Sequence, residues 1–479
     1  LSVIATLFSL TVGAATDSNN ADTVLYHNAT LINPATEQQL ADGWLLVQDG
    51  RIVQIGQQQA SASLPVAAKR IDLQDHYVMP GLIDVHLHLT AGPMRVEIQD
   101  GKPVITLKGH TELTRYHAIS TLATGVTTAF SPAGDTEANA EYVQQQQAGN
   151  WPGPKLTYAG FVFEPTPILG GSVYPKTEAD WQAEIASQKA LGAQYIKLYQ
   201  GLSKEEVAMG IRLAQAAGLK AIAHLDNVSW QYAADLGIDA LTHALPTSPE
   251  LLTGEDKAAY LAERKNPHSG RFTYSWFKHV DYDNAPMQQL FATLAQQQTR
   301  IDLTLVANEL IYFARELESL YPEPDMWVFH PQMRKGWRAA LAAPSYDWTA
   351  EEVDTAKQQM PKVQQLFKRL YDAGVPLAIG TDSVASGPFY LRELQLSQTA
   401  GLTNWQVLQL ATVGGARHLD LPDTGQLAAG FVADFIVLPA NPLTDLSALN
   451  TVHTVVQQGK AHPVAALKAE LANLSNTEL

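Results

Sequence analysis

Eight short segments with the pattern of strands alternate with helical stretches between about Pro80 and Leu421. In chain order these segments are DVHLHL, GVTTAF, LTYAGFVF, AQYIKLY, KAIAHL, DALTHAL, RIDLTLVA and PLAIGTD. Alternation of strands and helices is typical of α/β proteins with a parallel sheet, because each helix returns the chain to the start of the next strand. Eight units over this length predict a (β/α)8 TIM barrel. The alternative is an open doubly wound sheet, but no Gly-rich phosphate loop follows the first strand to support it.

The two ends of the chain have a different pattern, with short alternating strands separated by turn residues. At the N-terminal end these strands are TVLYHNATLINP, GWLLVQDGRIVQIG and RIDLQDHYVMPG, and Asp49-Gly50 is a favourable hairpin turn. The C-terminal end returns to this pattern in TGQLAAGFVADFIVLPANP and VHTVVQQGKAH. We therefore expect residues 21–79 and 422–479 to form one small β-sandwich domain beside a barrel domain of residues 80–421.

Residues 1–20 contain an apolar run that ends in the small residues Gly13, Ala14 and Ala15 and then becomes polar. This pattern is typical of the apolar region and cleavage site of a secretory signal. It predicts a signal-peptide remnant that is cleaved near Ala14 or Ala15, and a periplasmic or secreted protein. A buried N-terminal strand or helix is the alternative. The run is short for a membrane span and no later stretch is long enough, so we expect no span in the mature protein.

Charge and composition narrow the classes of partner. The chain carries 32 basic and 48 acidic residues, a net charge of −16, which argues against nucleic acid or an anionic membrane surface. The 479 residues include no cysteine, which excludes disulfides, thiolate metal sites and a cysteine nucleophile. A small-molecule substrate is the expected partner, and a homo-oligomer is compatible with the sequence.

Polar side chains gather at the ends of five of the predicted strands. In a TIM barrel these C-terminal strand ends form the active site. Histidine and carboxylate side chains suit zinc and similar divalent ions. Each residue alone has an ordinary structural explanation, but together they predict a metal site. We refer to them as the six predicted ligands: His86, His88, Lys197, His224, His243 and Asp382.

Lys197 needs a separate explanation, because a protonated ammonium group cannot bind a cation. Its neutral amine can react with carbon dioxide to give a carbamate, whose two oxygens can bridge two metal ions. Strand alternation places Tyr199 on the same face as Lys197 and nearer the barrel mouth. Tyr199 is thus a candidate catalytic residue that donates a hydrogen bond to the substrate carbonyl oxygen in the transition state, although a packing tyrosine is equally consistent with the pattern.

The motifs MPGLIDVHLH, YIKLY, AIAHLDN, ALTHAL, AIGTDS and GQLAAGFVADFIVL resemble those of the amidohydrolase superfamily. Within it, the chain is similar to the group around imidazolonepropionase and the metal-dependent Xaa-Pro dipeptidases, from about residue 23 to residue 460. The resemblance implies hydrolysis of an amide or cyclic amide bond, Xaa-Pro-like dipeptides included. It also implies two divalent metal ions, with zinc as the expected metal.

The same resemblance implies a role for each predicted ligand. The two histidines of the first strand would hold one ion together with Asp382. His224 and His243 would hold the other ion, and carboxylated Lys197 would bridge the pair together with a hydroxide. Two cations lower the pKa of the bridging water and polarise the scissile carbonyl. Asp382 would take the proton of the attacking hydroxide and pass it to the leaving amine.

Two departures from the family pattern keep other functions open. Asp226 stands in HLDNVSW, where many one-metal deaminases of the superfamily have a glutamate after the strand-five histidine. The segment KLYQGLS has one glycine, where dipeptidases often have a glycine pair. The alternatives are a one-metal deaminase of a small cyclic substrate, which would not need Lys197, a hydrolase of lactone or phosphotriester bonds, and a barrel that has lost catalysis and serves as a binding protein.

Substrate contacts are expected on the loops that follow the strands. The segment from Asn308 to Lys362 is long and rich in aromatic residues, which predicts either a lid over the site or a packed helical insertion. The segment FEPTPILGGSVYP after the third strand is a second candidate for a pocket wall. His117 and Arg392 are weaker candidates for site residues.

Overall fold

The fold was analysed in a computed structural model. It describes residues 23–58, 64–93, 95–99, 102–106, 108–165, 169–170, 172–264, 270–335 and 348–476. The predicted signal segment lies outside these residues. None of the helices in the described part of the chain combines the length and the apolar character that crossing a bilayer requires.

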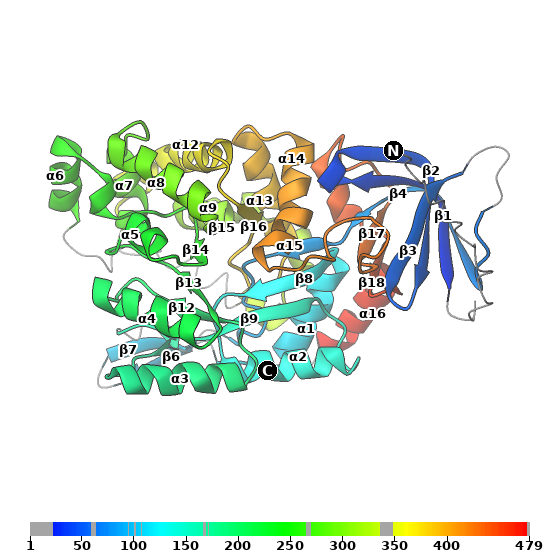
Figure 1. The fold of residues 1–479 in the computed structure, drawn as a ribbon, viewed down its shortest axis with the longest axis horizontal. Coiled ribbons are helices and arrows are strands. Elements are labelled where there is room, and N and C mark those ends of the chain that lie inside the picture. The colour runs from blue at the N-terminus through cyan, green and yellow to red at the C-terminus, as the bar shows by residue number, and fades with distance from the viewer. Residues whose placement is uncertain are drawn as a thin grey trace, which may run out of the picture.

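Eight parallel strands form a nearly closed barrel in the middle of the chain, as the sequence predicts (Figure 1). The first and last strands are joined by a hydrogen bond of 2.9 Å from the backbone N–H of Val85 to the carbonyl of Ile379. A short additional strand, β11 (Ser172–Val173), pairs with β9. The barrel strands are β5 (Leu82–Asp84), β8 (Val126–Ser131), β9 (Lys155–Phe163), β12 (Tyr195–Leu198), β13 (Lys220–Ala223), β14 (Ala240–Thr242), β15 (Arg300–Leu303) and β16 (Leu377–Ile379).

Helices follow the barrel strands and cover their outer faces (Figure 1). Several begin with a capping box, in which a Ser or Thr side chain and a side chain three residues later satisfy the free N–H groups of the first turn. The principal helices are α1 (Thr111–Ala123), α2 (Thr136–Gln147), α3 (Glu178–Ala190), α4 (Lys204–Ala216), α5 (Trp230–Asp235), α8 (Ala285–Gln297), α12 (Ala350–Asp372), α13 (Pro388–Thr399), α14 (Asn404–Gln409) and α15 (Gly415–His418).

Further helices lie in the long connections and at the C-terminal end. The connection between β14 and β15 contains α6 and α7, and α9 begins directly after β15. These elements are η3 (Pro249–Leu251), α6 (Gly254–Glu263), α7 (Phe272–His279), α9 (Leu305–Tyr312), α10 (Leu317–Leu320), η5 (Glu323–Val328), the π-helical η6 (Leu410–Gly414), η7 (Leu446–Thr451) and α16 (Val464–Leu474).

The two ends of the chain meet in one β domain, which confirms that they fold together (Figure 1). Its seven strands have the order β19-β18-β17-β4-β1-β2-β3. The pairs are antiparallel except for β1 and β4, which run parallel. A separate small core joins both ends, with Tyr26 in edge-to-face contact with Phe435. The strands are β1 (Val24–Asn33), β2 (Gln38–Gln48), β3 (Arg51–Gln57), β4 (Lys69–Pro80), β17 (Phe435–Leu438), β18 (Thr454–Gln457) and β19 (Lys460–Pro463), with η2 (Pro34–Thr36) between β1 and β2. The exact boundaries of the two predicted domains remain predictions.

A small three-stranded sheet is built from two connections of the barrel. It joins β6 (Arg95–Gln99) and β7 (Lys102–Thr106), which lie between β5 and α1, to β10 (Leu169–Gly170), which follows β9. The pair β6 and β7 is antiparallel, and β10 runs parallel to β7. The loop segments after the first and third barrel strands are therefore tied to each other by backbone hydrogen bonds.

The aromatic side chains described in the segment 308–362 pack largely within the protein. Tyr321 and Phe329 both contact Phe389 of α13, with ring centroids 4.6 and 5.4 Å apart. Trp348 contacts Tyr274 of α7 at 4.8 Å. These contacts support the packed insertion rather than a lid for this part of the segment. Trp337 and Tyr346 lie outside the described residues.

The first turn of α9 is capped by a side chain from another helix. Glu393 of α13 is fully buried, and its Oε2 atom accepts a hydrogen bond of 2.7 Å from the backbone N–H of Val306. Burial raises the pKa of Glu393 to about 8 from its ordinary value of 4.5, and the nearby carboxylates of Asp84 and Glu309 add to this increase. The backbone hydrogen bonds oppose it without cancelling it.

This environment predicts a measurable pH dependence of stability. Between pH 4.5 and about 8 the folded chain keeps a proton on Glu393 that the unfolded chain releases. The free energy of unfolding therefore falls as pH rises through this window, by about 1.4 kcal/mol for each unit of pKa difference. We expect the free energy of unfolding of Glu393→Gln, measured with denaturant, to fall less between pH 4.5 and about 8 than that of wild type. The exposed substitution Glu255→Gln is the control, and parallel curves for Glu393→Gln and wild type would contradict the assignment.

Candidate metal centre

The first strand and the last strand place three of the six predicted ligands together. His86 and His88 follow β5, and their Nε2 atoms lie 3.2 and 3.0 Å from the Oδ1 atom of Asp382, which follows β16. The Nδ1–H group of His88 donates to the carbonyl of Ala133 at 3.0 Å, which directs its Nε2 atom toward Asp382. Asp382 has a φ of 54°, an uncommon backbone conformation for a residue other than glycine, and such strain is often found at functional sites.

The two histidines of the fifth and sixth strands complete a continuous cluster of imidazole rings. The ring of His243 lies 4.9 Å from that of His86 and 4.6 Å from that of His224. His243 also has a positive φ, of 64°. Both ring nitrogens of His224 are buried, and neither has a hydrogen-bond partner among the described residues. Buried imidazole nitrogens without partners are costly in a folded protein, so this arrangement fits a ligand that binds a metal ion.

Lys197 lies at the base of the same cluster. Its side chain is only 2% exposed, and its Nζ atom donates a hydrogen bond of 3.2 Å to the Oγ1 atom of Thr242. Burial lowers the pKa of Lys197 to about 8, although the carboxylates of Asp302 and Asp382 oppose this shift. About a tenth of the amine is therefore neutral at pH 7, far more than for an ordinary lysine, and this is the form that can react with carbon dioxide.

Asp302 is a member of the cluster that the sequence analysis missed. Its Oδ1 atom lies 3.1 Å from Nδ1 of His86 and accepts a hydrogen bond of 3.0 Å from the backbone N–H of His243. Potential ligand atoms of Asp302, His86 and His243 lie within 4.8 Å of one another, close enough to share a metal ion, and so do those of His86, His88 and Asp382. The sequence indicated it in the segment RIDLTLVA, where Asp302 is an acidic residue between the apolar Ile301 and Leu303.

The carboxylates and imidazoles strongly affect each other's proton affinity. Burial would lower the pKa of His86, but Asp302 and Asp382 together raise it to about 9. Burial would raise the pKa of Asp302, but His86 and its hydrogen bond lower it to about 2. His86 in turn keeps the pKa of Asp382 well below its ordinary value against the effect of burial. Burial lowers the pKa of His243 to about 3. His86, with its raised pKa, is therefore protonated at neutral pH and would release its proton on binding a metal ion. The ionised carboxylates and the neutral imidazole of His243 are donors that a divalent cation prefers.

Tyr199 lies next to the cluster, as its strand face predicts. Its ring is in edge-to-face contact with that of His224, with centroids 4.9 Å apart. The loop that follows is anchored by Glu164, whose carboxylate accepts a hydrogen bond of 2.9 Å from the N–H of Gly201. A Cβ atom at Gly201 would collide with this carboxylate, which explains why the single glycine of KLYQGLS is needed there. The catalytic role of Tyr199 remains a prediction.

The weaker candidates have other surroundings. His117 is buried on α1, and its ring packs edge-to-face against those of Tyr116 and Phe329. Arg392 pairs with the buried carboxylate of Glu309. Asp226 accepts hydrogen bonds from Thr247 and Arg264.

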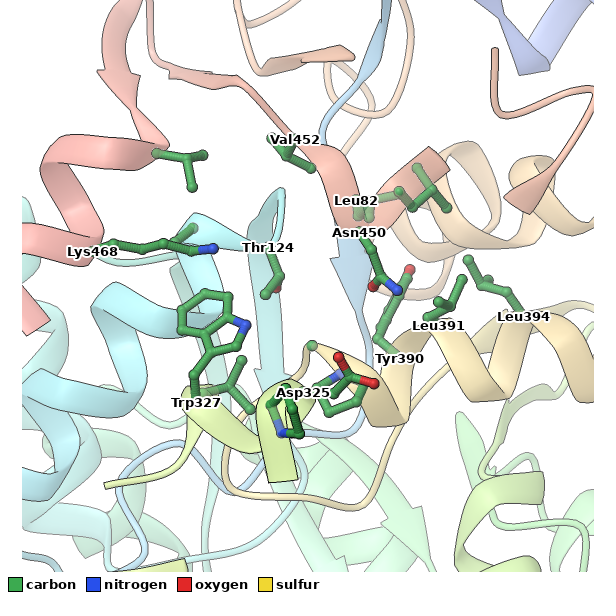
Figure 2. Close-up of a pocket in the computed structure, with 17 residues that line it drawn as sticks. Leu82, Thr124, Asp325, Trp327, Tyr390, Leu391, Leu394, Asn450, Val452 and Lys468 are labelled. Carbon is green, nitrogen blue, oxygen red and sulfur yellow. The ribbon is translucent and has the colours of Figure 1, made fainter. Parts of the chain in front are cut away.

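A cavity of about 290 Å³ lies between the barrel and the C-terminal part of the chain (Figure 2). Lys468, Trp327 and Thr124 line one part of it, and Asn450 and Tyr390 line another. The ammonium of Lys468 lies 4.4 Å from the centre of the Trp327 ring. None of the six predicted ligands lines this cavity, so it is separate from the metal centre.

A parallel barrel with histidines, aspartates and a buried lysine at the carboxyl ends of its strands defines a class of metal-dependent barrel hydrolases. The model of the Amidohydrolase family matches residues 77–462. The chain therefore belongs to the amidohydrolase family. This membership confirms the resemblance seen in the motifs and the predicted enzyme class, a hydrolase.

Individual relatives are similar over shorter stretches. The chain is 33% identical over 115 residues to 5-methylthioadenosine/S-adenosylhomocysteine deaminase of Caldicellulosiruptor saccharolyticus, a match that covers 20% of this chain and 25% of the relative. It is 39% identical over 84 residues to imidazolonepropionase of Deinococcus deserti, which covers 17% and 21%. These matches thus span a quarter or less of the relatives' lengths.

Similarity over the full length is found in solved structures. A crystal structure of a Xaa-Pro dipeptidase with bound methionine in the active site superposes with a TM-score of 0.64 at 19% identity. The match covers 92% of this chain and 100% of that chain. At this level of identity the likeness concerns the fold.

Proposed function

We propose that the protein is a binuclear metal-dependent amidohydrolase that cleaves amide or cyclic amide bonds in small substrates, dipeptide-like compounds included. The observation that carries this proposal is the position of Lys197, which is buried close to His224 and His243, whose pKa is lowered by burial and further by the charge of Lys197. A one-metal site has no need for a lysine there. A carbamate on Lys197 would supply the second shared ligand that a pair of ions requires.

The six predicted ligands are the residues that would hold the two ions, for which zinc is the proposed metal. When bound, divalent ions in such a site lower the pKa of water and polarise the carbonyl of the substrate. Asp302 orients the cluster from below, because it contacts the ring of His86 and the backbone of His243.

Asp382 is the proposed proton carrier. Its carboxylate faces the two histidines of the first strand and is ionised, so it can accept a proton from the attacking water. The same carboxyl group can then donate that proton to the nitrogen of the leaving amine, which prevents its expulsion as an anion. Tyr199 is placed beside His224, where its hydroxyl could donate to the oxygen of the scissile carbonyl.

The deaminase alternative has less support from the surroundings of Asp226. In the sequence this residue is the nearest acid to the position where one-metal deaminases of the superfamily have a glutamate. Its carboxylate is already engaged by Thr247 and Arg264, and Arg264 is itself largely buried. Asp226 is therefore held as a structural acid rather than a free proton donor.

A hydrolysis screen tests the proposed function directly. Purified protein loaded with Zn²⁺ is assayed against dipeptides, N-acyl amino acids, cyclic amides, lactones and phosphotriesters, while its metal content is measured. We expect two ions per chain and the highest kcat/KM within one of the amide classes. Release of ammonia with one ion per chain would instead favour the deaminase.

We also propose that the mature protein is exported to the periplasm or secreted. The apolar run that ends at Gly13, Ala14 and Ala15 supports this proposal. N-terminal sequencing of the protein recovered from its native host should begin close to Ala15. Recovery of a mature protein that still contains Leu1 to Phe8 would contradict it.

A further inference from the structure

His243 is contacted by Asp302 of β15 and by Thr304, which directly follows this strand. Asp302 and Thr304 are two positions apart, and both are fully buried. Asp302 accepts the backbone N–H of His243 at 3.0 Å, and the Oγ1 atom of Thr304 lies 2.7 Å from Nδ1 of the His243 ring. The seventh strand therefore fixes both the backbone and the ring of a residue on the sixth strand.

Thr304 stands at the start of α9, where a threonine hydroxyl ordinarily caps the helix. It is the N-cap residue of α9, and threonine at this position usually accepts a hydrogen bond from the N–H of the second or third helical residue. Here the side chain makes no capping hydrogen bond. The N–H of Val306, the second residue of α9, is instead satisfied at 2.7 Å by the carboxyl group of Glu393 on α13.

We propose that Thr304 is a positioning residue for His243, and that Glu393 makes this possible by taking over the cap of α9. With its hydroxyl free of the helix, Thr304 binds Nδ1 of His243, which also lies 3.9 Å from Oδ2 of Asp382. This hydrogen bond leaves Nε2 as the nitrogen available to a metal ion. The outer partner of a metal-binding histidine commonly selects its tautomer and ring orientation in this way. The inference rests on the proposed metal-dependent function, and it assigns roles to two residues that contact no substrate.

Substitutions at Thr304 distinguish the effect of its hydroxyl group from the effect of its size and shape. Thr304→Val keeps the volume and removes the hydrogen bond, whereas Thr304→Ser keeps the hydroxyl. We expect Thr304→Val to bind the more weakly held Zn²⁺ ion about 10- to 100-fold less tightly than wild type in competition with a chelator. Thr304→Ser should restore most of the affinity. Thr412→Val is the matched control, because Thr412 is also buried and hydrogen-bonded, to the carbonyl of Leu408, but belongs to a helix outside the site.

Substitutions at Glu393 test the indirect part of the proposal. Glu393→Ala removes the cap, so the Thr304 hydroxyl is drawn toward the N–H groups of α9 and away from His243. Glu393→Gln keeps an oxygen acceptor for Val306. We expect Zn²⁺ affinity to fall for the alanine variant and to stay within about threefold of wild type for the glutamine variant. If Glu393→Ala only destabilised the protein, its melting temperature would fall, but its Zn²⁺ affinity would match that of Glu393→Gln.

A readout without metal distinguishes this inference from the proposed function. Crystals of wild type and Thr304→Val are grown with a chelator. In wild type the His243 ring should be held against Thr304. In Thr304→Val the ring should be rotated or adopt several orientations. An unchanged ring and unchanged Zn²⁺ affinity in Thr304→Val would overturn the inference. If wild type itself binds no Zn²⁺ but the ring still moves in the variant, the positioning role holds and the metal-dependent function fails.

Discussion

Replacing Lys197 by alanine should remove one metal ion per chain, or both, together with most of the hydrolytic activity. The buried amine lies within the histidine cluster, and burial lowers its pKa to about 8, so it is suited to form the proposed carbamate. The negative charge of that carbamate offsets the repulsion between two cations. Metal analysis of wild type and variant side by side, with mass spectrometry of the intact wild type, measures both the bridge and the ions.

The variant allows a rescue experiment and a control. Short carboxylates such as acetate or propionate should restore part of the activity of Lys197→Ala, because they can occupy the position of the lost carbamate. Lys204→Ala removes an exposed lysine that pairs with Glu250 and should leave metal content and rate unchanged. If wild type holds one ion and Lys197→Ala equals it in metal content and rate, the binuclear proposal is wrong and the one-metal deaminase becomes the leading interpretation.

Asp382→Asn should lower kcat by at least about a hundredfold, the lower end of the effect of a lost acid–base group. Asparagine keeps the size and one oxygen next to His86 and His88, so metal content should fall much less than the rate. The control is Asp420→Asn, which changes a carboxylate that pairs with Lys220 and Arg300 at the opposite ends of the strands. Turnover close to that of wild type in Asp382→Asn, measured at saturating substrate, would refute its role as proton carrier.

The barrel was predictable because its signal is local and repeated. Each of the eight quoted segments overlaps one barrel strand of the structure, although the first, DVHLHL, shares only Asp84 with β5. The periodicity of each strand indicates which side chains face inward. The joining of both chain ends was also predictable from their shared pattern. The parallel pairing of β1 with β4 was not, because alternation reveals the faces of a strand but not its neighbour or its direction.

The candidate site was partly predictable for the same reason. Residues on strand ends of a parallel barrel must converge, and the structure brings the six predicted ligands into one cluster, although their roles as ligands stay predictions. Asp302 was not predicted to belong to the site, because a single acidic residue between apolar ones was interpreted only as part of the strand. The function of Glu393 could not be read from the sequence, because α13 lies 80 residues or more from the turn that it caps and only the folded chain joins them.

The β domain makes completion of the fold depend on the last part of the chain. β4 leads directly into the barrel, yet one of its edges is paired only with β17, where Pro80 lies opposite Phe435. During synthesis this edge stays open until after the whole barrel has been made, because β17 follows β16 and α15 in the chain. Closing such a distant contact is slow, and an open strand edge invites pairing with other chains. We therefore expect the chain to be prone to aggregation at this edge until β17 pairs with β4.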